Sequence, residues 1–80
     1  MILPLSSVPP GTVVRVVDVD AGFGLRTRLI NMGFVKGAKV KVIENSGCQI
    51  LVSIGGESGR VVALSRGIAN KILVEVEVEV

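Results

Sequence analysis

The chain has 80 residues, enough for one small domain over residues 1–80 but too few for two lobes with a cleft between them. Hydrophobic residues make up 49% of it and the mean hydropathy is +0.66, which excludes an intrinsically disordered chain. The net charge is only +2, and there are two Phe and no Trp, Tyr or His. This composition does not favour a nucleic-acid binder, and it lacks the residue that most often serves as a general base or metal ligand.

The N-terminus and the single cysteine indicate the cellular compartment. The longest apolar run, residues 61–64, is far shorter than the roughly 20 residues that cross a bilayer. The first five residues contain no basic region of the kind that begins a signal peptide. Cys48 has no partner for an internal disulfide. We therefore expect a cytoplasmic protein that is not inserted directly into a membrane.

The first part of the chain combines an extended lead-in with a strand. Residues 3–11 end in Pro-Pro-Gly, which is typical of a turn. Residues 12–19 are rich in valine and predict a strand, in which Val14, Val16 and Asp18 share one face and Val19 lies on the other.

A change of period then predicts a short helix near residues 24–32. Leu25, Leu29 and Met32 follow one another at i, i+4 and i+7, which places them on one helical face. Gly33 can adopt the left-handed conformation that ends a helix. A chain this small needs every apolar stripe for its core, so we expect this stripe to pack inward and Phe34 to be buried.

Short strands with turn signals between them fill most of the remaining sequence. Ser65 is a suitable N-cap for a helical turn near residues 65–71. The predicted strands are residues 38–44, 48–54, 60–64 and 72–80, with turns or loops at 45–47 and 55–59.

The last predicted strand alternates acidic and apolar residues. Its carboxylates could collect divalent cations, but like charges about 7 Å apart along a strand rarely converge on one ion. We interpret them as charges that keep a strand edge from pairing with other chains. The opposite face could be covered by a second copy of the protein, giving a homo-oligomer. The acidic face holds Glu75, Glu77 and Glu79, and the apolar face holds Val76, Val78 and Val80.

Other polar groups offer little chemistry. Asp18 and Asp20 are more typical of a turn than of a metal site, and together with Glu75 and Glu77 they are only weak metal candidates. Cys48 has no histidine to activate it as a nucleophile. The glycine-rich segments lack the Gly-Lys-Ser/Thr of a phosphate-binding loop. We therefore expect neither an enzyme nor a resident cofactor, with weak divalent-metal binding as the remaining alternative.

Three residues at the start of the predicted helix are our candidates for binding a partner. The guanidinium groups of Arg26 and Arg28 can bond a carboxylate or phosphate through two parallel hydrogen bonds. Phe23 lies between Gly22 and Gly24 and could serve as an exposed anchor. The competing interpretation is an ordinary solvated helix face with Phe23 folded onto the rim of the domain.

Two stretches of the sequence carry a family resemblance. Residues 25–40 contain Arg-Leu-x-x-Met-Gly-Phe-x-x-Gly-x-x-Val, and residues 62–74 contain an Ala-Leu…Ala…Ile-x-Val ending. Both resemble the FeoA family of small cytosolic proteins that accompany the FeoB ferrous-iron permease, and the resemblance extends from Leu5 to Val74. The chain departs from many relatives in its short loop at residues 45–47 and in Gly67 and Ile68, where acidic residues often occur.

The resemblance implies a fold and a partner. The fold is all-β with short helices, a small SH3-like barrel of about five strands with a helix across one opening. The implied partner is the cytosolic part of the permease, including its GTP-binding domain, and the implied role is regulatory docking without chemistry.

Two alternatives remain open. The same fold resembles the C-terminal SH3-like domain of metal-dependent repressors of the DtxR group, so the chain could act on such a regulator. Five basic residues between Arg26 and Lys41 leave an RNA- or ribosome-associated barrel as the other alternative.

Overall fold

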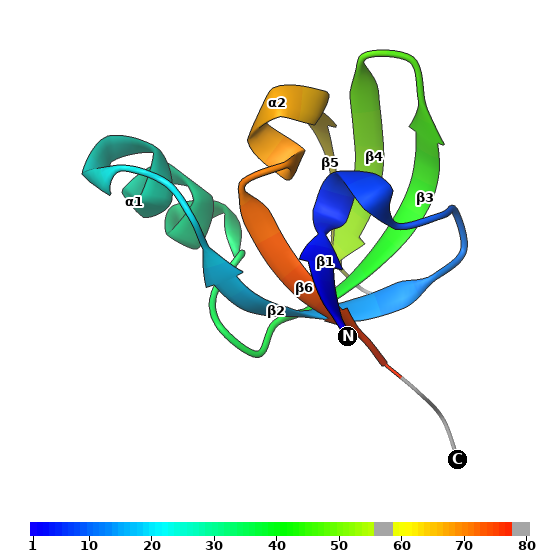
Figure 1. Cartoon of the computed structure of the whole chain (residues 1–80), viewed down its shortest axis with the longest axis horizontal. Coiled ribbons are helices and arrows are strands. Elements are labelled where there is room, and N and C mark those ends of the chain that lie inside the picture. The colour runs from blue at the N-terminus through cyan, green and yellow to red at the C-terminus, as the bar shows by residue number, and fades with distance from the viewer. Residues whose placement is uncertain (56–58, 78–80) are drawn as a thin grey trace.

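The computed structural model describes residues 1–55 and 59–77 as one antiparallel sheet with short helical segments (Figure 1). The six strands lie in the order β1-β6-β2-β3-β4-β5. This confirms the expected all-β class with short helices. In chain order the elements are β1 (Ile2–Pro4), the 3₁₀ helix η1 (Leu5–Ser7), β2 (Val13–Val19), α1 (Phe23–Met32), β3 (Lys39–Ser46), β4 (Gln49–Ile54), β5 (Arg60–Ser65), α2 (Arg66–Ala69) and β6 (Ile72–Val76).

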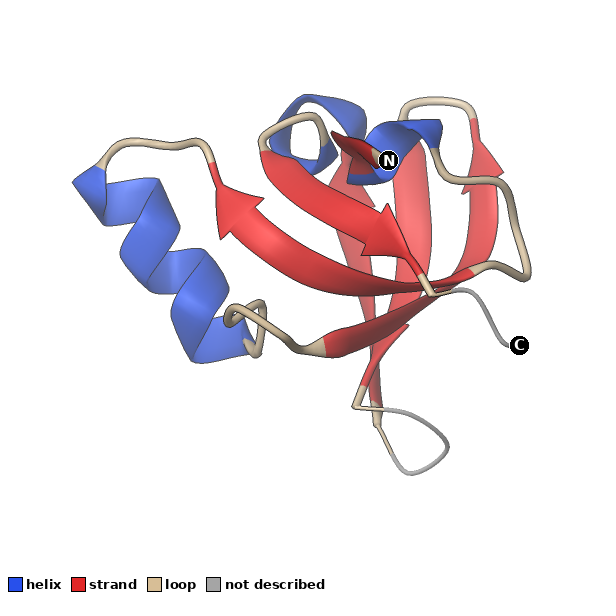
Figure 2. Cartoon of the chain, turned by 60° about the horizontal axis from the view of Figure 1, so that its bottom comes forward, coloured by secondary structure: helices blue, strands red, loops and turns tan. Residues whose placement is uncertain are grey.

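The strands curve around a single apolar core, with α1 at one end of the sheet and well apart from α2 (Figure 2). Phe34 is fully buried, as expected from the sequence. The helical stripe is also confirmed, because Leu29 is buried and Leu25 and Met32 pack against the core. The other buried apolar residues are Leu5, Val8, Val14, Val16, Val19, Val40, Val42, Ile50, Val52, Ile54, Leu64, Ala69, Ile72 and Val74.

The structure adds a strand that the sequence did not indicate. Residues Ile2–Pro4 of the lead-in pair with β6, with Leu3 opposite Val74. Proline is tolerated there because β1 is an edge strand with one side unpaired. β6 therefore lies between β1 and β2, and Glu75 is paired on both sides, with Ile2 and with Arg15. Our interpretation that the glutamates protect a sheet edge is wrong for Glu75, whereas Glu79 lies outside the described residues.

A bulge in β2 corrects the predicted faces of that strand. Val16 lies opposite Val74, but the next pair joins Asp18 to Leu73, so Val17 is an extra residue on β2. The extra residue reverses the alternation of faces. As a result Val19 is buried on the same side as Val14, and Asp18 is exposed and does not share the face of Val14 as predicted.

Gly33 ends α1 in the way that its position suggested. Its φ of 111° is left-handed, and its N–H donates a hydrogen bond to the Ile30 carbonyl at 3.0 Å. The Phe34 N–H donates to the Leu29 carbonyl at 3.0 Å, and both of these side chains are buried. This pair of hydrogen bonds with its apolar contact is the Schellman arrangement, which here joins the helix end to the core.

A polar cluster holds η1 and α2 against the β3–β4 turn. Arg66 donates to the Ser6 carbonyl at 3.2 Å, to the Gly47 carbonyl at 3.0 Å and to Asn45 Oδ1 at 2.6 Å. Asn45 Nδ2 in turn donates to the carbonyls of Ser6 and Val8, at 3.0 and 2.7 Å. The Ser65 hydroxyl accepts from the Ile68 N–H, which confirms it as the cap of α2. This side of the molecule is thus occupied by structural hydrogen bonds.

We predict that Gly33→Ala destabilises the fold, whereas Gly24→Ala does not. A Cβ at residue 33 would have a strained φ and would lie 3.1 Å from Ile54 Cγ2, while a Cβ at residue 24 meets nothing within 4 Å. The left-handed conformation alone costs a non-glycine residue about 1–2 kcal/mol. Alanine at residue 24 is expected to be neutral or stabilising by up to about 1 kcal/mol. Urea unfolding of both variants measures the difference, and equal unfolding free energies would contradict this account of the helix end.

Candidate docking surface around the first helix

The three predicted partner-binding residues all lie in the first half of α1 but differ in their surroundings. Phe23 is the first residue of the helix and is 87% exposed. It follows Gly22, whose extended backbone begins the helix without a side-chain cap. Arg28 is exposed and, within the described part of the chain, has no ion pair or side-chain hydrogen bond. Because 87% of Phe23 is exposed, its ring does not fold onto the rim of the domain.

Arg26 is held against the end of β2. Its guanidinium donates to the Val19 carbonyl at 3.3 Å and lies 3.4 Å from Asp18 Oδ1. The same carboxylate oxygen accepts the Val19 N–H at 2.8 Å. Both side chains are about half exposed, so the ion pair contributes at most about 1 kcal/mol. Asp18 and Arg26 thus link the helix to the end of the strand, and the half-exposed Arg26 guanidinium is directed toward β2.

The geometry of α1 separates Arg28 from Phe23. An α-helix turns about 100° per residue, so Phe23, Arg26 and Ile30 share one side, which lies about 125° around the helix from the centre of the buried stripe. Arg28 lies about 140° around the helix from Phe23. We call Phe23, Arg26 and Ile30 the outer face of α1.

Ile30 is the member of this face that the sequence reasoning missed. It is 42% exposed and lines a groove of about 290 Å³ between α1 and β2, together with Val17, Arg26 and Lys36. The sequence signal that could have identified Ile30 is its spacing of seven residues from Phe23, which places both residues on one side of a helix. The outer face therefore presents two apolar side chains with a cation between them.

The candidate metal ligands are not brought together. Within residues 1–55 and 59–77, no group of three or more His, Cys, Asp or Glu side chains could hold an ion. Glu77 Oε1 lies 3.1 Å from Arg15 and its Oε2 lies 3.7 Å from Lys39, so this carboxylate is engaged by two cations. Glu75 lies 3.9 Å from the N-terminal amine of Met1. Asp20 follows the C-terminal end of β2, whereas Glu77 pairs with Arg15 near its start. The Asp20 N–H donates to the Lys71 carbonyl.

The structure also gives the location of Cys48 and of part of the C-terminal segment. Cys48 is exposed at the β3–β4 turn. Val76 is 38% exposed, whereas Val78, Glu79 and Val80 lie outside the described residues. Among the helices described, none combines the length and apolarity needed to traverse a bilayer.

Comparison with known proteins agrees with the resemblance in the sequence. The FeoA domain family matches residues 3–76. A protein of Methanocaldococcus jannaschii named "Putative Fe(2+) transport protein A" is 40% identical over 72 residues, which cover 90% of this chain and 84% of that protein.

Solved structures show the same similarity in three dimensions. A crystal structure of an iron uptake regulatory protein (FeoA) has a TM-score of 0.87 and 32% identity, covering 96% of this chain and all of the other. The FeoA of Stenotrophomonas maltophilia, a prokaryotic SH3 domain protein complexed with zinc, has a TM-score of 0.79 and 29% identity over 91% of this chain and 89% of its own.

The repressor alternative is supported at the level of the fold alone. A manganese-dependent transcriptional repressor has a TM-score of 0.85 at 20% identity, and the match covers 95% of this chain but 37% of the repressor. The match over residues 3–76 and the 40% identical relative, in contrast, extend over nearly the whole sequence. The chain therefore belongs to the FeoA family and has its SH3-like fold.

Proposed function

We propose that this protein is a cytoplasmic accessory protein of ferrous iron transport that docks on the cytosolic part of a FeoB-type permease, including its GTP-binding domain. Membership of the FeoA family supports the transport role, as do the names of its relatives. The observation that carries the docking mode is the outer face of α1, where Phe23 is 87% exposed beside the half-exposed Ile30. Ferrous iron is the cargo of the partner in this proposal, and the protein itself catalyses no reaction.

The outer face has the composition of a small protein–protein contact. Aromatic and arginine side chains are the commonest energetic anchors of interfaces. Burying Phe23 against a partner would contribute about 1.5–3 kcal/mol. Arg26 is already oriented by Asp18 and Val19, so little of its conformational freedom would be lost on binding.

Docking of this protein would regulate the permease if the permease has two conformations. A docked protein shifts such an equilibrium only by as much as its affinity differs between the two states. Contacts by α1 to a segment that moves during the nucleotide cycle would supply that difference.

We predict that Phe23→Ala weakens capture of the purified cytosolic part of the permease by about tenfold or more, because it removes the exposed aromatic anchor. Biolayer interferometry measures the affinity. Val61→Ala is the matched control, because Val61 is also exposed, at 58%, but lies on β5. Binding that is unchanged by Phe23→Ala, with the variant folded, would rule out the outer face as the docking surface.

Arg28 tests how far the interface extends around the helix. We predict that Arg28→Glu weakens capture by a few-fold and leaves the melting temperature unchanged, since exposed ion pairs are individually weak. Lys71→Glu makes the same charge change at an exposed site beyond α2 and is expected to have no effect. A lower melting temperature for Arg28→Glu would instead make this residue structural.

We also predict that the isolated protein binds ferrous or manganous ion only weakly, with Kd above about 0.1 mM, because Glu77 is paired with cations and the other carboxylates lie apart. Anaerobic isothermal titration calorimetry measures this affinity. Binding in the micromolar range at a defined stoichiometry would contradict the proposed role as an adaptor without a metal of its own.

A further inference from the structure

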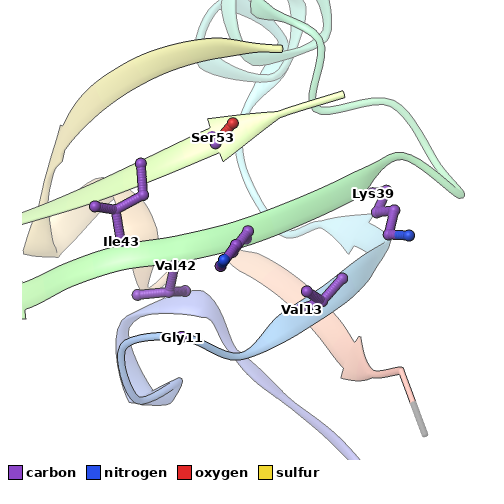
Figure 3. Close-up of a pocket in the computed structure, with 7 residues that line it drawn as sticks. Gly11, Val13, Lys39, Val42, Ile43 and Ser53 are labelled. Atoms are coloured by element: carbon purple, nitrogen blue, oxygen red, sulfur yellow. The ribbon is translucent and has the colours of Figure 1, made fainter. Parts of the chain in front are cut away.

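A second, larger groove lies on the outer surface of β2, β3 and β4. It has a volume of about 790 Å³, and Figure 3 shows its lining side chains on the three neighbouring strands. Its lining includes Gly11, Val13, Lys39, Lys41, Ile43 and Ser53. Lys39, Lys41 and Ile43 are exposed, so this is an open surface groove and not an enclosed cavity.

The strand register builds this groove from both apolar and basic side chains. Val13 lies opposite Lys41, and Lys41 lies opposite Ser53, so these three form one row across β2, β3 and β4. A bulge in β3, between the pairs of Val42 and Glu44, makes Ile43 the extra residue. Ile43 lies two residues beyond Lys41 on the same outward side of β3 and is 42% exposed. The Gly11 N–H donates to the Val42 carbonyl at 2.7 Å, which secures one rim of the groove.

The groove is basic. Lys39 and Lys41 line it, and no Asp or Glu does so in the described part of the chain. Lys39 Nζ lies 3.7 Å from Glu77, whereas Lys41 is exposed and has no ion pair or side-chain hydrogen bond among the described residues. The Lys41 ammonium is therefore available to an incoming carboxylate.

The dimensions of the groove suit an extended chain. Residues 39 to 43 of β3 span about 13 Å, which is the length of about four residues of extended peptide. Lys41 and Ile43 are two positions apart, as are successive side chains on one side of an extended segment, at about 7 Å. An acidic residue followed two positions later by an aliphatic residue would match this pair.

We propose that this groove binds an extended peptide segment of a partner protein, with a carboxylate at Lys41 and an aliphatic side chain against Ile43 and Val13. Nucleic acid fits less well, because no aromatic side chain lines the groove for base stacking and Glu77 lies beside Lys39. The proposal concerns a surface separate from the outer face of α1 and does not depend on docking to a permease.

The test is an NMR titration of the ¹⁵N-labelled full chain with the octapeptide Gly-Ser-Glu-Thr-Ile-Thr-Ser-Gly. We expect saturable amide shifts confined to residues 11–13, 39–43 and 53. The same peptide with Gln for Glu is expected to bind about twofold to fivefold more weakly, because it has no carboxylate for Lys41. No saturable shifts, or shifts centred on α1, would overturn the proposal.

Two variants and a matched control assign the contacts. Lys41→Glu is expected to weaken peptide binding by about fivefold to tenfold, and Ile43→Ser by about fivefold, with unchanged unfolding curves since both side chains are exposed. Lys71→Glu makes the same charge change away from the groove and should leave the affinity unaltered. Equal losses for Lys41→Glu and Lys71→Glu would indicate a mere effect of net charge and overturn the proposal.

An eight-nucleotide oligouridine is the final competitor. If it shifts the same amides and binds more tightly than the peptide, the groove is a nucleic-acid site and the peptide proposal is wrong. Phe23→Ala is expected to leave peptide binding unchanged. Failure of this proposal is therefore distinguishable from failure of permease docking, because each surface responds to a different variant.

Discussion

Burial of one face of a single curved sheet is the constraint on which this structure depends. An 80-residue chain has little apolar surface to spare, so each strand must direct its inner face to the same core. The bulges at Val17 and Ile43 serve this requirement, because each inserts one residue that changes which side chains face inward. The bulge in β2 buries Val19 and leaves Asp18 outside. The bulge in β3 follows the regular alternation of residues 39 to 43, in which Ile43 already lies on the surface, and it changes the faces of the residues after it.

The helix α1 illustrates how such a small domain holds a projecting element. Its C-terminal end is joined to the core by Gly33 and Phe34, and its N-terminal half by the bonds of Arg26 to the end of β2. A short helix at the end of a sheet can bury only one of its sides. Phe23 and Ile30 therefore remain exposed on a helix that is fixed at both ends, which is a favourable arrangement for an anchor because little ordering is needed on binding.

The two surfaces proposed for binding share β2 but use opposite ends of it. The outer face of α1 adjoins Val19, whereas the groove begins at Val13. Glu77 forms ion pairs with Arg15 of β2 and Lys39 of β3, whereas Lys41 has no ion pair within residues 1–55 and 59–77. An adaptor with two such surfaces can contact a folded domain and an extended segment at the same time, and linkage of the two contacts raises the effective affinity of each.

Local sequence signals determined the elements of this protein. The spacing of Leu25, Leu29 and Met32, the glycine at residue 33 and the cap at Ser65 each act within a few residues, and the structure agrees with all of them. The family was also recognisable from motifs within the chain. Only the tertiary structure decided the pairing of β1 with β6, the two bulges, the ion pairs of Arg26 and Glu77, and which side of α1 stays exposed. These features depend on which distant segments meet, and side-chain period alone carries no information about that.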